Sequence, residues 1–165
     1  MDSSAIAARL EADYPTPSIH LDSPYHKQFV VHARNTLVPL QGIFIPLVPV
    51  RLLSDASVPY FVTTREKDVG SSLEQFSRDR GGEQAWEGMA KGLVEITKML
   101  EENEGPFFMG TTVSYTDFFY AGMLLFFKSL GDDIFDRVRK ASGDDGKTMF
   151  ALLEAVEPWS KRNSF

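Results

Sequence analysis

The stretch GPFFMGTTVSYTDFFYAGMLLFFKSLG, residues 105–131, is the most informative part of this sequence. Ser114 and Asp117 stand three residues apart directly before an apolar run, which is the pattern of a capping box at a helix N-terminus. The run from Tyr115 to Leu130 is apolar on nearly every side of a helix, and such a helix belongs in the interior of a domain. We therefore predict a buried central helix over residues 115–130.

Further helices are predicted from apolar residues that recur at three- and four-residue steps. Ser71 and Glu74 form a second capping box, and Gly70 and Gly81–Gly82 mark expected helix ends. The tail from Pro158 is expected to be loosely held. Besides residues 115–130, we predict helices over residues 3–13, 57–69, 71–79, 83–104, 133–142 and 147–156.

Residues 25–54 allow two interpretations. The first half places apolar side chains on one helical stripe, but Pro39, Pro46 and Pro49 interrupt the apolar second half. Alternating Ile and Val residues there also suit a strand. Because proline removes the donors that a strand ladder needs, we favour a kinked or broken buried helix. The predicted fold class is all-α, a helical bundle that follows a proline-containing linker at residues 14–24.

Composition excludes several classes of function. The 165 residues include 23 acidic and 17 basic side chains, and none of them is Cys. Without Cys there is no disulfide scaffold, thiolate zinc site or cysteine nucleophile. The net charge of −6 argues against a nucleic-acid partner. Residues 118–127, the longest apolar stretch, are too few to span a membrane, and the N-terminus does not resemble a signal peptide. We expect a cytoplasmic protein with no membrane partner.

The residues alone predict no catalytic constellation. His20, His26 and His32 lack a His or carboxylate partner at helical spacing, so no metal site is expected. The sequence contains no Walker loop, nucleophile elbow or dinucleotide fingerprint. The acidic residues at 132, 133 and 136 suit a solvated helix start. The residues alone therefore predict only a helical domain with an apolar cleft.

Two motifs resemble the cytosolic glutathione S-transferases. GPFFMGTTVSYTDFFYAGMLL resembles the buried-helix signature of their helical C-terminal domain, and DSSAIAARLEADYP resembles the end of their thioredoxin-like domain. YFVTTREKDVGSSLEQF is similar to a stretch of fungal members of the β-etherase and ustiloxin-cluster branch. The resemblance implies a remnant of the thioredoxin-like domain, its last helix and linker, over residues 1–21. Residues 22–165 would form the C-terminal helical domain.

The resemblance also implies binding residues. Asp2 and Ser3 match the positions that hold the γ-glutamyl end of glutathione, at a helix N-terminus that favours an anion. Either residue could instead be a plain N-cap. Arg65 could meet a carboxylate, or it could form an ion pair with Glu66 or another neighbour. The expected substrate-binding residues are Phe29, His32, Thr36, Arg65, Phe119 and Met123.

The function implied is that of a glutathione transferase or glutathione-dependent isomerase, acting as a homodimer on a small hydrophobic electrophile. A step in fungal secondary-metabolite biosynthesis fits the branch resemblance. The strands and the thiol-activating residue of the thioredoxin-like domain do not occur in this sequence. We therefore expect this chain to be either the C-terminal part of a longer transferase or a half-length protein that keeps only the helical domain. The alternative functions are a scaffold or interaction module and a ligand carrier.

Overall fold

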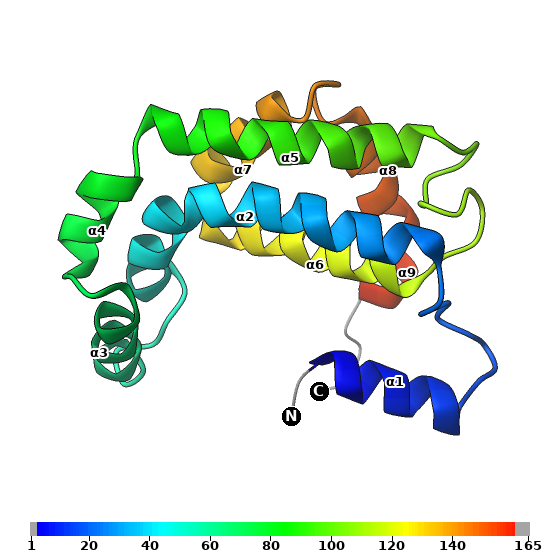
Figure 1. Cartoon of the computed structure of the whole chain (residues 1–165), viewed down its shortest axis with the longest axis horizontal. Helices are drawn as coiled ribbons and strands as arrows, with labels where there is room; N and C mark the ends of the chain where they lie inside the picture. Colours follow the sequence, from blue (N-terminus) through cyan, green and yellow to red (C-terminus); the bar gives the residue numbers. More distant parts are fainter. Residues whose placement is uncertain (1–2, 161–165) are drawn as a thin grey trace.

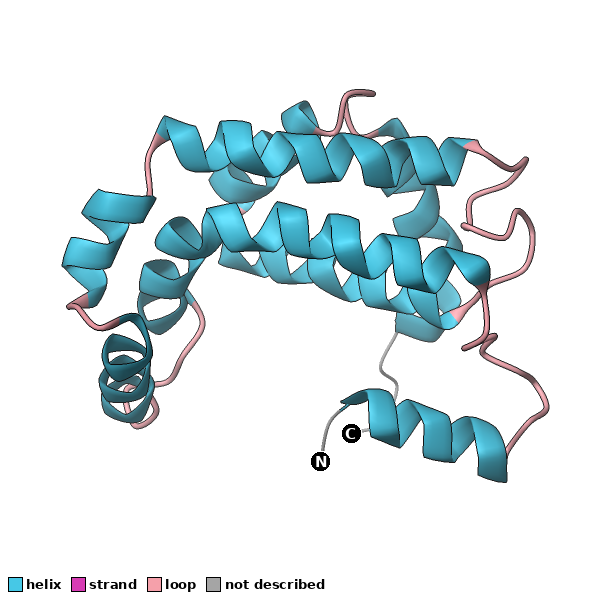
Figure 2. Cartoon of the chain, in the orientation of Figure 1, coloured by secondary structure: helices cyan, strands magenta, loops and turns pink. Residues whose placement is uncertain are grey.

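The computed structural model describes residues 3–160, and that range contains helices and no β-strand (Figures 1 and 2). The predicted all-α fold is confirmed. Isolated β-bridges join Phe107 to Gly110 and Met109 to Thr112 in the loop before α6. The helices are α1 (Ser3–Asp13), α2 (Pro24–Arg51), α3 (Val58–Val69), α4 (Leu73–Arg80), α5 (Glu83–Glu101), α6 (Tyr115–Leu130), α7 (Asp132–Ala141), α8 (Lys147–Ala155) and α9 (Glu157–Ser160).

Three long helices, α2, α5 and α6, run side by side and form the body of the bundle (Figure 1). α7 and α8 each pack against both α5 and α6 and cover the face that α2 leaves open. α3 and α4 form an arm at the end where α2 finishes, and α1 lies apart at the opposite end (Figure 1). No helix in residues 3–160 is long and apolar enough to cross a membrane.

The core lies between α2, α5 and α6 and continues under α7 and α8. Phe29, Leu93 and Tyr120 are fully buried there, one from each of these helices. α6 is central as predicted, but it is not buried on nearly every side, because 40% of the Phe119 surface is exposed. Gly122 and Leu125 on the same side are exposed as well. One apolar side of α6 therefore faces away from the core.

α2 is one helix of 28 residues that runs through Pro39, Pro46 and Pro49. The strand interpretation is wrong, and the helix is not broken, although its last turns bend toward α3 (Figure 1). Interior proline costs a helix a hydrogen bond, so the end of α2 needs support from other elements. Arg51 provides it, because its guanidinium donates to the Leu130 carbonyl at 2.6 Å and to both carboxylate oxygens of Asp133 at 2.7 and 3.1 Å.

The predicted capping box at α6 is confirmed. The Ser114 N–H and hydroxyl both donate to Asp117 Oδ2 at 2.7 Å. Asp117 Oδ1 also accepts the Phe108 N–H at 2.9 Å, a bond that the sequence pattern does not predict. Ser114 and Asp117 are fully buried, and burial raises the pKa of the Asp117 carboxyl. Asp117 therefore joins the start of α6 to the 105–110 loop.

The second capping box is displaced by one residue from its predicted position. The N-cap of α4 is Ser72, whose hydroxyl accepts the Gln75 N–H at 3.2 Å, and not Ser71. Glu66 Oε1 on α3 accepts the Leu73 N–H at 3.1 Å, so the side chain of another helix caps the same end. This contact between α3 and α4 favours Ser72 over the adjacent Ser71 as the N-cap of α4.

Replacing Asp117 with alanine should destabilise the protein strongly. Asp117→Ala leaves two buried N–H donors without an acceptor, and such groups cost about 1–3 kcal/mol each. We expect the free energy of unfolding in urea to fall by about 3 kcal/mol. Ser72→Ala, at the more exposed cap of α4, should cost only about 1 kcal/mol. Equal effects of the two variants would contradict the structural role assigned to Asp117.

Glycine at position 92 lets α5 approach α2 closely. A Cβ there would lie 2.6 Å from both the His32 carbonyl oxygen and Thr36 Oγ1. Gly92→Ala should therefore destabilise the protein by about 2 kcal/mol through overpacking. Gly122→Ala is the matched control, because a Cβ at Gly122 has no heavy atom within 4 Å. That control should stabilise α6 by about 0.5–1 kcal/mol in thermal or urea unfolding.

Candidate binding groove between α2 and α6

The exposed side of α6 forms one wall of an apolar groove of about 460 Å³. This volume lies within the range of small-molecule pockets. Leu37 and Phe44 of α2 form the other wall. The α6 residues that line the groove are Tyr115, Phe118, Phe119, Gly122, Met123 and Phe126.

The spacing of the α6 residues explains why they share a groove. They recur at steps of three and four along the helix, which places them on one face. The opposite face carries Tyr120, Leu124 and Phe127, which are fully buried in the core. α6 thus has two apolar faces with different surroundings. The missing side chain of Gly122 keeps the middle of the exposed face open.

Aromatic pairs stand at both ends of the groove. Phe44 and Phe126 meet edge to face, with ring centroids 5.6 Å apart and planes at 87°. Tyr115 and Phe119 form a similar pair nearer the start of α6, at 6.4 Å and 80°. Edge-to-face pairs present both ring edges and ring faces, which suit an aromatic ligand. The Met123 thioether between them is polarisable and adapts to flat rings.

His26 packs behind the Tyr115 end of the groove. Its ring centroid lies 5.2 Å from that of Tyr115 and 6.5 Å from that of Phe119. His26 Nδ1 lies 3.3 Å from the Thr116 hydroxyl, within hydrogen-bonding distance. Partial burial lowers the pKa of His26 below its ordinary value, because removal from water disfavours the charged ring. The surroundings of the Tyr115 end therefore favour the neutral form of this histidine.

Of the residues predicted to bind substrate, Phe119 and Met123 line this groove. Phe29 and Thr36 are fully buried beneath the surface. The Phe29 ring supports Phe119 from the core, with centroids 5.6 Å apart. The Thr36 hydroxyl donates to the His32 carbonyl at 2.9 Å and packs against Gly92. Both residues shape the helix packing behind the groove and do not line it.

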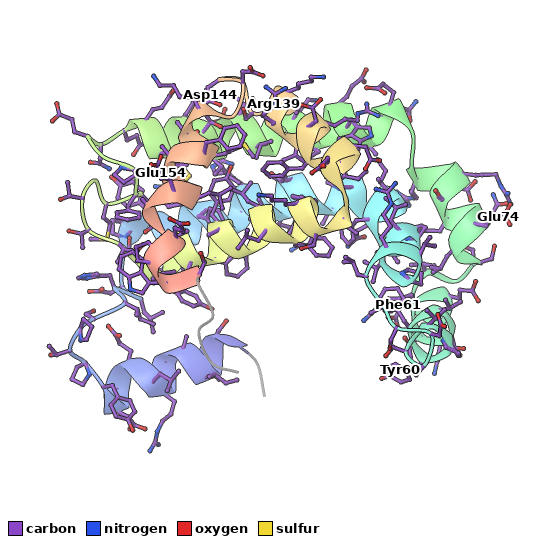
Figure 3. All side chains as sticks on the ribbon, turned by 180° about the vertical axis from the view of Figure 1, so that it is seen from behind. Tyr60, Phe61, Glu74, Arg139, Asp144 and Glu154 are labelled. Atoms are coloured by element: carbon purple, nitrogen blue, oxygen red, sulfur yellow. The ribbon has the colours of Figure 1, made fainter. Side chains whose placement is uncertain are left out.

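His32 and Arg65 lie elsewhere. His32 lines a second groove, of about 580 Å³, between α2 and α5. Arg65 is on the α3 arm, where it donates to Asp68 at 2.7 Å and lies 5.6 Å from the Phe61 ring centroid. Figure 3 shows Phe61 on this arm, at the opposite end of the molecule from α1. Arg65 makes the ion pair with a neighbour that the alternative interpretation expects.

Of the two predicted glutathione-binding residues, only Ser3 falls within the described part of the chain. Asp2 lies outside the described residues, and Ser3 is the first residue of α1, with a side chain that the structure does not describe. Contacts around Ile19 join α1 to α6: Glu11 Oε2 accepts the Ile19 N–H at 3.0 Å. The Ile19 carbonyl in turn accepts the Tyr115 N–H at 2.7 Å. The linker thereby connects α1 to the Tyr115 end of the groove.

Sequence reasoning missed most of the groove. The three- and four-residue stripe through Phe119 and Met123 could have identified Tyr115, Phe118, Gly122 and Phe126 on the same face. No sequence signal marks Leu37 and Phe44, because their place in the groove depends on how α2 packs against α6. Among residues 3–160 there is no group of three or more His, Asp or Glu side chains that could hold a metal ion.

Comparison with known proteins identifies the family. Residues 25–159 match the family model of the glutathione S-transferase C-terminal domain. The chain therefore belongs to the glutathione S-transferase family through its helical domain. A search of curated proteins gives no match.

One solved structure with a similar fold is a glutathione S-transferase of Ceriporiopsis subvermispora, crystallised in complex with glutathione. It is 27% identical to this chain and superposes with a TM-score of 0.76. The match covers 99% of this chain and 68% of that protein. The likeness to a fungal transferase is thus found, whereas the narrower β-etherase and ustiloxin-cluster branch stays a prediction.

Proposed function

We propose that this protein acts as a glutathione transferase whose α2–α6 groove holds a small hydrophobic electrophile. The observation that carries the proposal is the exposed aromatic face of α6 in a member of this family. Leaving such a face open to water costs free energy that a bound apolar ligand recovers. We expect the protein to work in the cytoplasm as a homodimer.

Glutathione binding is proposed at the start of α1. The related fungal transferase was crystallised with glutathione, which supports the same ligand here. A helix N-terminus favours the γ-glutamyl carboxylate, with the Ser3 hydroxyl as donor and the Asp2 carboxylate opposite the ammonium. Residues 1–21 would then belong to a thioredoxin-like unit, and residues 22–165 to the helical domain that binds the electrophile.

The proposed reaction joins the glutathione sulfur to the bound electrophile. The thiolate attacks an electrophilic carbon, a carbon–sulfur bond forms and the leaving group departs with its electron pair. With a conjugated alkene the thiolate can instead add and later leave after bond rotation, which gives cis/trans isomerisation. The groove contributes by orienting the electrophile and excluding water from it. A substrate from fungal secondary metabolism would suit either reaction.

Blocking the groove tests this function. Gly122→Leu should place a side chain in the groove without a clash at its Cβ. We expect kcat/KM for 1-chloro-2,4-dinitrobenzene, measured with glutathione as the second substrate, to fall roughly 10-fold or more. That change is a loss of about 1.4 kcal/mol of transition-state stabilisation. Gly122→Ala, which leaves most of the groove free, should stay within about twofold of the wild type. Unchanged turnover in Gly122→Leu would place the electrophile elsewhere.

The glutathione site is tested separately by calorimetry. Ser3→Ala should weaken glutathione binding roughly 10-fold or more, because a hydrogen bond to a charged group contributes about 1.5–3 kcal/mol. Ser129→Ala, on α6, is the control and should bind glutathione as the wild type does; its hydroxyl donates within its own helix. Full affinity in Ser3→Ala would show that the γ-glutamyl site is misplaced.

A ligand carrier is the second candidate. The residues that line the groove all come from α2 and α6, so the groove needs no other domain to exist. Binding of an aromatic compound with no glutathione-dependent turnover, and no glutathione binding, would favour the carrier over the transferase.

A further inference from the structure

We propose that the Tyr115 hydroxyl determines which ligands the α2–α6 groove selects, by donating a hydrogen bond to an acceptor at one end of a flat aromatic molecule. The ligand class is thus an aromatic carbonyl compound and not a plain hydrocarbon. This inference rests on the proposed function, because it assigns the orientation of the molecule in the same groove.

The first argument is the chemistry of the lining. Among the described residues that line the groove, Tyr115 alone carries a polar atom in its side chain that can donate a hydrogen bond. The others are Phe, Leu, Met and Gly residues. In a mainly apolar pocket, a small number of polar groups fix the orientation of the ligand. A phenol hydroxyl can donate a hydrogen bond to a carbonyl oxygen.

The second argument is that Tyr115 is held in place from three sides. It is the first residue of α6, between the two residues of the capping box, and its N–H donates to the Ile19 carbonyl at 2.7 Å. Its ring packs against His26 and Phe119. Within residues 3–160 its hydroxyl makes no hydrogen bond, so the donor is free for a ligand. A fixed donor loses little conformational entropy on binding.

The third argument is the contrast in polarity between the two ends of the groove. Phe44 and Phe126 close the far end with two apolar rings. Tyr115 and Phe126 are eleven residues apart on α6, which corresponds to about 16 Å along the helix. A molecule of two fused rings with one carbonyl group is shorter than this length, so it can lie within the groove with its polar end at Tyr115 and its rings against Met123.

The test uses two ligands of matched shape, 2-acetylnaphthalene and 2-isopropenylnaphthalene. They differ in a carbonyl oxygen that the second replaces with a methylene group. NMR titration of the whole chain gives the dissociation constant of each ligand for the wild type and for Tyr115→Phe. We expect Tyr115→Phe to weaken binding of the ketone roughly 3- to 10-fold, which is the range of one hydrogen bond. The affinity for the alkene should change less than about twofold.

Two control variants separate the possible outcomes. Tyr60→Phe makes the same chemical change at an exposed position on the α3 arm (Figure 3) and should alter neither affinity. Gly122→Leu should weaken the binding of both ligands. Equal loss of both ligands in Tyr115→Phe, or no loss of either, would overturn the role of Tyr115 and leave the groove intact. If Gly122→Leu binds both ligands as tightly as the wild type does, the proposed groove itself is overturned.

Discussion

The buried carboxylate of Asp117 is the contact on which the arrangement of the groove depends. Burying an ionised group is costly unless donors surround it, and Asp117 has donors from Ser114 and from Phe108. These bonds fix where α6 begins and therefore the rotation of every later residue about the helix axis. A start displaced by one residue would turn α6 by about 100°. The aromatic stripe would then no longer face the groove.

Local signals predicted local structure well, because they depend on neighbours in sequence. The Ser114–Asp117 box needs only its own turn, and it forms as expected. The choice between Ser71 and Ser72 depends on Glu66 from another helix, so the sequence could not settle it. Likewise, three interior prolines argue for a break in α2. The helix persists because packing against α5 and the contacts of Arg51 support it from outside.

The candidate site was harder to predict than the fold because α6 is apolar on two opposite faces. Hydrophobicity alone distinguishes inside from outside only when one face is polar. Here Tyr120 and Phe127 are buried in the core, whereas Phe119 and Phe126 line the groove. On α2, two of the predicted residues lie on the core side and not in the groove. Phe29 and Thr36 face the core and Gly92, and only the packing of α2 on α5 and α6 shows this.

This arrangement has a consequence for selectivity. An apolar groove separates similar hydrocarbons weakly, since one methylene group is worth only about 1–3 kcal/mol of binding. A fixed polar group discriminates more strongly, because a ligand that lacks the partner leaves that group unpaired. Tyr115 holds such a position at the start of α6, beside the linker that joins α1 to the bundle. The same anchored helix start that sets the face of α6 therefore also supplies the polar group of the groove.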